Sequence, residues 1–450
     1  MSKAHHQIRR RGSKDDSRRA WKRLDNASNI FIATMTDLDT KVFRIGADLD
    51  HDIDTRILQV ALDRTYDRYP LYHSVMRRGF FWYYLEESDL RPVVRPDKLV
   101  PFEHLYHLDR RDLLFRVVHH GRRVSLEVFH ALSDGTGGWW FFQDLVTEYL
   151  RLRAGDVREP IAPTAETSLG DDSFVAHFGE RSGRSTQFGQ DSSAGKNPLF
   201  GSEGPSVARI RGTITPDRRN RLIELTVPAD EVVRRAKAAG SSVTIHLIAM
   251  YFEAARRILR DENPHIAITV PVNLRTYFPS ETTRNFFSVT RLEHTYGIGD
   301  DSIEAVAGSL KAQLMPQLSK KSLQARSDAL LDMQRHPIAR FVPRVVKDAI
   351  LSVVNSINER ALTLGMTGLG KLELADDVDE QVGALHLSVS SRRPQMSILT
   401  HRNWMTLGFT SPFVETDLVE AFVDLLREEG IPVTASVTKV TEAELEGARR

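Results

Sequence analysis

Residues 130–135 read HALSDG, a histidine followed by aspartate and glycine at the fourth and fifth positions after it, and they lie where two periodicities meet. Before them, residues 123–129 alternate polar and apolar side chains, which predicts a half-buried strand whose apolar face continues to His130. After them, residues 139–150 carry apolar side chains at helical spacing. The pattern therefore predicts a loop from strand to helix, with the imidazole of His130 on the inward side.

A loop of this kind suits general acid–base chemistry. Rigid elements on both sides hold a titratable ring beside a cavity, and Gly135, Gly137 and Gly138 let a ligand approach the backbone closely. Histidine is also the side chain whose ordinary pKa lets it accept and return a proton near neutral pH. His130 is therefore the candidate base, and the alternative is a buried histidine satisfied by backbone groups.

Further segments accompany the motif along the chain. Residues 128–138 read VFHALSDGTGG, residues 270–275 read VPVNLR and are followed by NFFS at 285–288, and residues 362–370 read LTLGMTGLG. Together and in this order they resemble the CoA-dependent acyltransferase superfamily, in particular condensation domains and alcohol acetyltransferase-like proteins, which are related to chloramphenicol acetyltransferase and the BAHD enzymes. The resemblance extends from about residue 24 to about residue 435.

Two departures narrow the resemblance. Condensation domains usually carry two adjacent histidines, of which the second is catalytic, whereas this chain has Phe129 before His130. The DFGWG element of the BAHD enzymes is absent from the C-terminal region. The resemblance therefore points away from the plant-type enzymes and keeps His130 in the catalytic position.

The resemblance implies an α/β fold, a two-lobed sandwich like that of chloramphenicol acetyltransferase with a central substrate tunnel. The mixed order of predicted strands and helices, without strict alternation, agrees with it. We expect a flexible basic tail at 1–23, an N-terminal lobe with the HxxxDG motif at 24–154, a linker or crossover at 155–217 and a C-terminal lobe at 218–450. Residues 30–36 are expected as a strand entering the N-terminal lobe.

The resemblance also implies the chemistry, in which an acyl group moves from a thioester donor, acyl-CoA, to an alcohol or an amine. His130 would act as general base, with no covalent acyl-enzyme. Asp134 would point away from the reacting centre and pair with an arginine, for which Arg275 is the candidate, beside the turn at Gly135. Oxyanion or substrate contacts are expected from one of three hydroxyl side chains, Thr367, Thr410 and Ser411.

Three functional hypotheses stay open on the sequence alone. The first is a stand-alone transferase that uses acyl-CoA as co-substrate and holds no permanently bound cofactor. The second is a condensation or chain-release acyltransferase that depends on an acyl-carrier protein in trans, because no carrier module is recognisable in the 450 residues. The third is a catalytically silent binding protein of the same fold.

Composition excludes several other classes of protein. The chain has no cysteine, which removes disulfides, a thiol nucleophile and cysteine-ligated metals, and we expect no metal site. With 61 basic and 60 acidic residues the charge gives no global signal for nucleic-acid binding. No apolar run approaches the length of a membrane span, and the first residues lack the apolar stretch of a secretory signal. We therefore expect a cytoplasmic protein, and a monomer.

Motifs typical of other protein classes match the sequence less well than the HxxxDG motif does. Residues 365–371 read GMTGLGK, which fits the first seven positions of a phosphate-binding P-loop, but Leu372 replaces the metal-binding hydroxyl residue and an acidic stretch follows. Neither the G-x-S-x-G of serine hydrolases nor the H-E-x-x-H of zinc peptidases occurs. The aromatic run WWFF at 139–142 is expected as core rather than as a platform for stacking bases.

Overall fold

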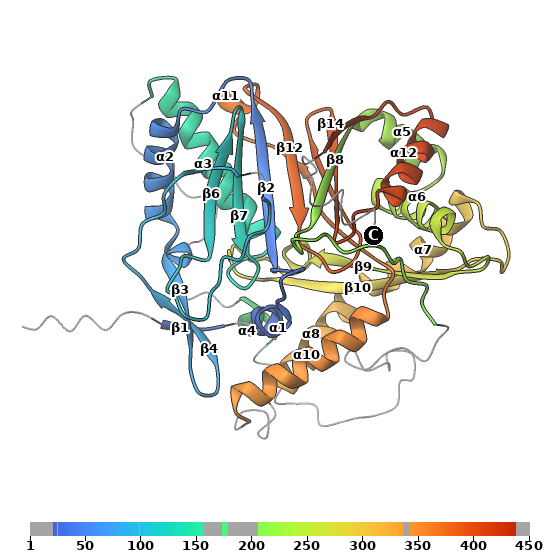
Figure 1. Cartoon of the computed structure of the whole chain (residues 1–450), viewed down its shortest axis with the longest axis horizontal. Helices are drawn as coiled ribbons and strands as arrows, with labels where there is room; N and C mark the ends of the chain where they lie inside the picture. The colour runs from blue at the N-terminus through green and yellow to red at the C-terminus, as the bar shows by residue number, and fades with distance from the viewer. Residues whose placement is uncertain are drawn as a thin grey trace, which may run out of the picture.

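The computed structural model describes residues 21–24, 26–98, 100–156, 173–178, 206–335 and 342–437. Within these ranges the chain forms two main sheets that lie side by side, with helices on their outer faces (Figure 1). This is the mixed α/β, two-lobed architecture that the sequence predicts. The predicted tail up to residue 20 and the linker residues 157–172 and 179–205 lie outside the described residues.

The first sheet has five strands in the order β12, β2, β7, β6, β5. Their bounds are β2 (Val42–Leu49), β5 (Arg95–Pro96), β6 (Phe115–His120), β7 (Arg123–Phe129) and β12 (Val382–Val389). All neighbours are antiparallel except β5 and β6. The helices α2 (Thr55–Arg68) and α3 (Gly135–Arg153) pack together over one face of this sheet (Figure 1).

The second sheet has seven strands in the order β10, β9, β11, β13, β14, β8, β15. Their bounds are β8 (Arg221–Pro228), β9 (His265–Asn273), β10 (Phe287–Thr295), β11 (Leu364–Leu372), β13 (Gln395–His401), β14 (Trp404–Ser411) and β15 (Thr434–Val437). Four helices belong to its outer layer, α5 (Ala229–Ala238), α6 (Val243–Ile258), α7 (Ile303–Gln317) and α12 (Asp417–Glu428). The central helix α6 is buried continuously from Ile245 to Ala255, as its largely apolar sequence requires.

Strand β12 comes late in the chain but belongs to the first sheet. On one side β12 pairs with β2, where Val389 lies opposite Phe43. On its other side β12 contacts β14, where the Thr406 hydroxyl donates to the Leu385 carbonyl at 2.6 Å. The sequence predicts that all residues from 218 onward belong to the C-terminal lobe, and β12 is a strand of that segment that crosses to the other lobe. The remaining boundaries of the proposed division stay predictions.

A cluster of charged side chains also joins the two sheets. Arg123 at the start of β7 donates to Asp48 at 2.6 Å and to Glu224 of β8 at 2.5 Å, and His386 of β12 lies between the two carboxylates. Burial alone would favour a neutral Glu224, but His386 and Arg123 outweigh it and lower the pKa of Glu224 to about 2. The cluster therefore stays ionised at neutral pH and links β7, β8 and β12.

The remaining elements lie together at one end of the molecule (Figure 1). They are a three-stranded sheet of β1 (Trp21–Arg23), β4 (Tyr83–Glu87) and β3 (Ser74–Arg78), and the helices α1 (Asn26–Thr34), α4 (Ser173–Phe178), α8 (Lys320–Arg335) and α10 (Arg344–Arg360). Short helical turns are η1 (Pro70–His73), η2 (Leu274–Thr276) and α11 (Asp376–Asp379).

Two sequence expectations change in the structure. The strand expected at 30–36 is wrong, because Asn26–Thr34 form helix α1; a short apolar run does not distinguish a strand from a buried helix by periodicity. The residues that resemble a P-loop form strand β11 with a bulge between Gly368 and Gly370. Their backbone therefore pairs with neighbouring strands and does not form a phosphate-binding loop.

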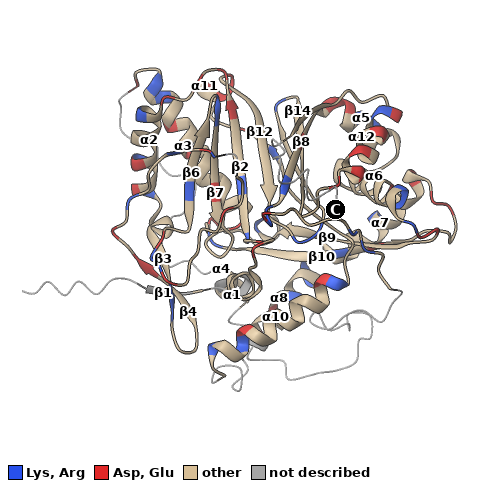
Figure 2. Cartoon of the chain, in the orientation of Figure 1, with Lys and Arg blue, Asp and Glu red and all other residues tan. Residues whose placement is uncertain are grey.

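Charge is mixed over the surface. Basic and acidic side chains are interspersed over both halves of the molecule (Figure 2). Among the described residues, no helix is both long enough and apolar enough to span a membrane.

The contact between β12 and β14 yields a test of the fold. A side chain at Gly408 would collide with the backbone carbonyl of Leu387, so we expect Gly408→Ala to lower the free energy of unfolding by about 1–3 kcal/mol. Gly308 in α7 has open space around it, so Gly308→Ala should instead raise stability by about 0.4–1 kcal/mol. Denaturant unfolding measures both, and equal effects of the two variants would contradict the close approach of β12 and β14.

Candidate active site

His130 lies directly after β7, as the alternating pattern predicts. Its backbone N–H donates to the carbonyl of Lys41 at 2.7 Å, which extends the pairing of β7 with the chain before β2. Three phenylalanine rings surround the imidazole: Phe31 of α1 stacks on it at 4.2 Å between ring centroids, while Phe43 lies at 5.2 Å and Phe287 at 5.7 Å. The ring is thus held by strand β7 on one side and by aromatic walls on the others.

Asn285 fixes which nitrogen of His130 carries the proton. Ser28 donates its hydroxyl hydrogen to the carbonyl of Ala131 at 2.8 Å, so its oxygen is left to accept. The Asn285 amide nitrogen donates to this oxygen at 3.1 Å and to the His130 carbonyl at 2.8 Å. The amide oxygen of Asn285 therefore faces His130 Nδ1, at 3.2 Å, and accepts from it. Nδ1 holds the proton and Nε2 holds the lone pair.

The surroundings of His130 keep it neutral. Burial among the phenylalanine rings lowers the pKa of His130 below its ordinary value, and this outweighs the opposing effects of Asp134 and of its hydrogen bonds. A neutral imidazole with a free Nε2 lone pair is the state that a general base needs before reaction. Since Nδ1 is already engaged, Nε2 is the only ring atom available to take a proton.

Asp134 does not contact the imidazole and instead joins the two lobes. It is the N-cap of α3, where its Oδ1 accepts from Gly137 N–H at 2.9 Å. Its Oδ2 accepts from Arg275 at 2.7 Å and from the N–H of Phe286 at 2.8 Å. Both charged side chains are only 6% exposed, so the pair is a buried one. The pairing of Asp134 with Arg275 that the resemblance implies is present.

Arg275 in turn holds the loop before β10. Its guanidinium donates to the carbonyls of Thr282 and Arg284, at 2.7 and 2.8 Å, and stands 5.3 Å from the ring centroid of Trp140 on α3. This loop carries Asn285 to the imidazole. The geometry therefore connects Asp134 to His130 indirectly, through Arg275 and the backbone of residues 282–286.

The glycines of the motif are required by close packing. A side chain at Gly137 would overlap the Thr283 carbonyl, and one at Gly138 would overlap the ring of Phe43. At Gly135 it would meet Leu369 of β11. The strand-to-helix loop, the first sheet and the second lobe thus come together at contact distance around residues 135–138.

A hollow of about 380 Å³ opens beside this junction. Its walls include Thr136 and Trp140 from the first lobe, and Asn273 and Leu369 from the second. The Asn273 amide donates to the Thr136 hydroxyl across it, at 3.2 Å. Thr367 lies two residues before Leu369 on β11, ahead of the bulge, and is not among the residues that line this hollow.

The structure does not bring the three expected hydroxyl side chains to one place. Thr367 lies on β11 of the second sheet, whereas Thr410 and Ser411 lie at the end of β14. Strands β12 and β2 stand between β14 and β7, so Thr410 and Ser411 are remote from His130. No contact of Thr367 with the motif loop is observed among the described residues, so its role as an oxyanion donor stays a prediction.

Sequence reasoning missed the residues that orient the base. Asn285 belongs to a segment that carries the resemblance but receives no role from it. Phe31 lies in the segment expected as a strand, and Ser28 lies just before that segment. A possible signal is the NFFS segment itself, which places a polar amide next to two aromatics before a strand. Among the described residues, no group of three or more metal-binding side chains is found at this site or elsewhere.

No protein-family model and no curated protein sequence matches the chain. Solved structures match it over most of its length. The first condensation domain of the calcium-dependent antibiotic synthetase has a TM-score of 0.60 and 16% identity, over 91% of this chain and 96% of that one. The TRI3 trichothecene 15-O-acetyltransferase from Fusarium sporotrichioides has a TM-score of 0.59 and 11% identity, over 93% and 97%. TRI101 of F. graminearum, complexed with coenzyme A and deoxynivalenol, has a TM-score of 0.55 and 9% identity, over 91% and 97%.

These similarities establish the fold. A condensation domain and an acetyltransferase share it with this chain, so the fold that the resemblance implies is confirmed. Because one fold can host many activities, the function has to follow from the geometry around His130.

The buried ion pair can be tested by a double-mutant cycle. Breaking a buried pair by removing one charge leaves the other uncompensated, so Asp134→Asn and Arg275→Gln should each lower the free energy of unfolding by about 3–5 kcal/mol. The double variant should lose clearly less than the sum, because no lone charge remains. Denaturant unfolding of the four proteins gives the coupling energy. The exposed pair Arg427–Asp424 on α12 is the control, and its coupling energy should be less than about 1 kcal/mol. Additive losses at Asp134 and Arg275 would contradict the pairing.

Proposed function

We propose that this protein is an acyltransferase that moves an acyl group from acyl-CoA to a hydroxyl or amine acceptor, with His130 as general base. The observation that carries the proposal is the contact of His130 Nδ1 with the Asn285 amide oxygen, which leaves the lone pair on Nε2, and burial that lowers the pKa of the ring favours this uncharged form. The acceptor and the donor thioester would meet at Nε2, near the junction of the two lobes.

The reaction follows from this arrangement. Nε2 takes the proton of the acceptor hydroxyl or amine as its oxygen or nitrogen forms a bond to the thioester carbonyl carbon. The carbonyl oxygen becomes an oxyanion, for which Thr367 is the proposed donor. The tetrahedral intermediate then breaks its carbon–sulfur bond, and the imidazolium returns the proton to the leaving thiolate. No side chain is acylated in this sequence of steps.

Acyl-CoA is the donor that we propose, as a co-substrate and not as a bound cofactor. A protein of this fold has been solved with coenzyme A, and another is named an acetyltransferase, which supports this choice. We also propose that the protein is a monomer and that it works in the cytoplasm.

The second candidate is transfer from an acyl-carrier protein in trans. The condensation domain of an antibiotic synthetase has the same fold at a TM-score of 0.60, which supports this candidate. The chemistry at Nε2 would be the same with either donor, so only the source of the thioester separates the two.

Thiol release from a panel of acyl-CoAs with mixed alcohol and amine acceptors tests the proposal. Removing the base should slow acceptor-dependent release by about 10²–10⁴-fold, so we expect that loss in His130→Ala at matched folded fraction. His119→Ala is the control, because His119 lies at the far end of β6 near Thr55 and should leave the rate unchanged.

The outcomes separate the hypotheses. Release that is unchanged in His130→Ala would overturn His130 as the base. Release from an acyl-carrier protein but from no acyl-CoA would select the second candidate. Release from neither donor, by a folded wild-type protein, would leave the silent binding protein of the same fold and refute the enzyme.

A further inference from the structure

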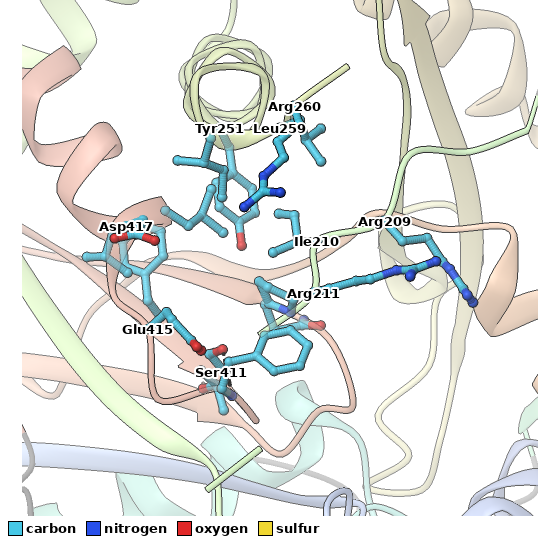
Figure 3. A pocket seen from close by; sticks show the side chains of 17 residues that line it. Arg209, Ile210, Arg211, Tyr251, Leu259, Arg260, Ser411, Glu415 and Asp417 are labelled. Atoms are coloured by element: carbon cyan, nitrogen blue, oxygen red, sulfur yellow. Dashed lines mark hydrogen bonds between the residues drawn. The ribbon is translucent and has the colours of Figure 1, made fainter. Parts of the chain in front are cut away.

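A second cavity lies within the C-terminal lobe, apart from His130. It measures about 510 Å³ and opens between the ends of β13 and β14, the end of α6, the start of α12 and the segment 209–211 (Figure 3). Neither His130 nor any residue that contacts its imidazole lines this cavity. The proposed acyl transfer makes no use of it.

Tyr251 presents a hydroxyl group to this cavity that has no hydrogen-bond partner among the described residues. The side chain is fully buried, and its ring packs edge-on against Phe409 at 5.8 Å and Phe422 at 6.1 Å. The Tyr251 side chain points toward the cavity that Ile210 and Arg260 also line (Figure 3). Burial raises the pKa of Tyr251, so the hydroxyl remains a donor at every physiological pH. A buried donor without an acceptor destabilises a fold unless a ligand supplies one.

Positive charge surrounds the opening. Arg260, just beyond the end of α6, extends its guanidinium toward the cavity that Tyr251 also lines (Figure 3). Arg209 and Arg211 stand at the other side and also line an adjoining hollow of about 320 Å³ together with Arg360. None of the four arginines forms an ion pair with a described residue.

Two carboxylates also line the cavity, and neither forms an ion pair with the arginines among the described residues. Both oxygens of Glu415 accept from the backbone N–H of Thr213, at 2.9 and 2.8 Å, so this carboxylate is hydrogen-bonded to the protein backbone. Asp417 belongs to the first turn of α12, where a carboxylate is stabilised by the helix dipole. The guanidinium of Arg260 thus faces the cavity without pairing to either carboxylate.

The walls between these groups are apolar. Ile210, Leu259, Leu418 and Val419 come from three different elements and enclose the space below the arginines. A cavity with apolar walls and a few convergent polar groups is the usual form of a small-molecule site. The Arg260 guanidinium and the Tyr251 hydroxyl are the donors without a partner among the described residues, and together they favour an anionic ligand.

We infer that this cavity binds an organic anion with an apolar body, such as a medium-chain carboxylate. The anionic group lies between the Arg260 guanidinium and the Tyr251 hydroxyl, and the apolar body lies along Ile210, Leu259 and Leu418. The inference is independent of the acyl transfer proposed at His130, because no residue is shared between the two sites.

Calorimetric titration with octanoate tests the inference directly. Octanoate should bind, while 1-octanol and octylamine of the same chain length should bind at least about tenfold more weakly, because they lack the negative charge. Arg260→Gln and Tyr251→Phe should each weaken octanoate binding by about 10-fold or more, as expected for a hydrogen bond to a charged group. Arg427→Gln, an exposed arginine of α12 outside the cavity, is the control and should leave the affinity unchanged.

The melting temperature of the ligand-free protein shows whether the Tyr251 hydroxyl has a role in ligand binding or in stabilising the fold. Tyr251→Phe keeps the ring packing and removes only the unsatisfied hydroxyl, so the ligand-free variant should melt at or above the wild-type temperature. A lower melting temperature would show that the hydroxyl supports the fold and would overturn its role in binding. Equal affinity for octanoate and octanol, or no octanoate binding by the wild type, would overturn the anion site.

Discussion

The buried ion pair between Asp134 and Arg275 is the interaction on which the rest of the site depends. Asp134 caps α3 in the first lobe, while Arg275 gathers the carbonyls of the loop before β10 in the second. Neither side chain reaches the imidazole. Their pairing brings the loop with Asn285 against His130, and Asn285 then determines the tautomer of the ring. Asp134 therefore links the two lobes and is not the partner of His130 Nδ1.

An amide rather than a carboxylate at Nδ1 has a chemical consequence. A carboxylate would stabilise the imidazolium and raise the histidine pKa, whereas the neutral Asn285 orients the ring without adding charge. Burial among Phe31, Phe43 and Phe287 then lowers the pKa of His130. The site thus favours an uncharged imidazole, which is the state that the proposed general base requires before reaction.

The sequence predicted the parts of this arrangement that are local. The alternation over residues 123–129 places His130 at the end of β7, and the helical spacing after it predicts α3, because each depends only on neighbouring residues. The resemblance supplied Arg275 as the partner of Asp134. Contacts such as those of Ser28 and Asn285 with the His130 loop join residues more than a hundred positions apart, and no local pattern encodes them. The crossing of β12 to the first sheet and the remoteness of Thr410 from His130 are likewise properties of the assembled lobes.

The most direct measurement is the tautomer of His130 at pH 7, read from long-range proton–nitrogen spectra of protein with ¹⁵N-labelled histidine. The signal is assigned by its loss in His130→Gln. The account predicts a neutral ring with the proton on Nδ1 and an unprotonated Nε2. A proton on Nε2, or an imidazolium, would leave no base facing the acceptor and would contradict the chain of contacts from Asp134 through Arg275 and Asn285 to His130.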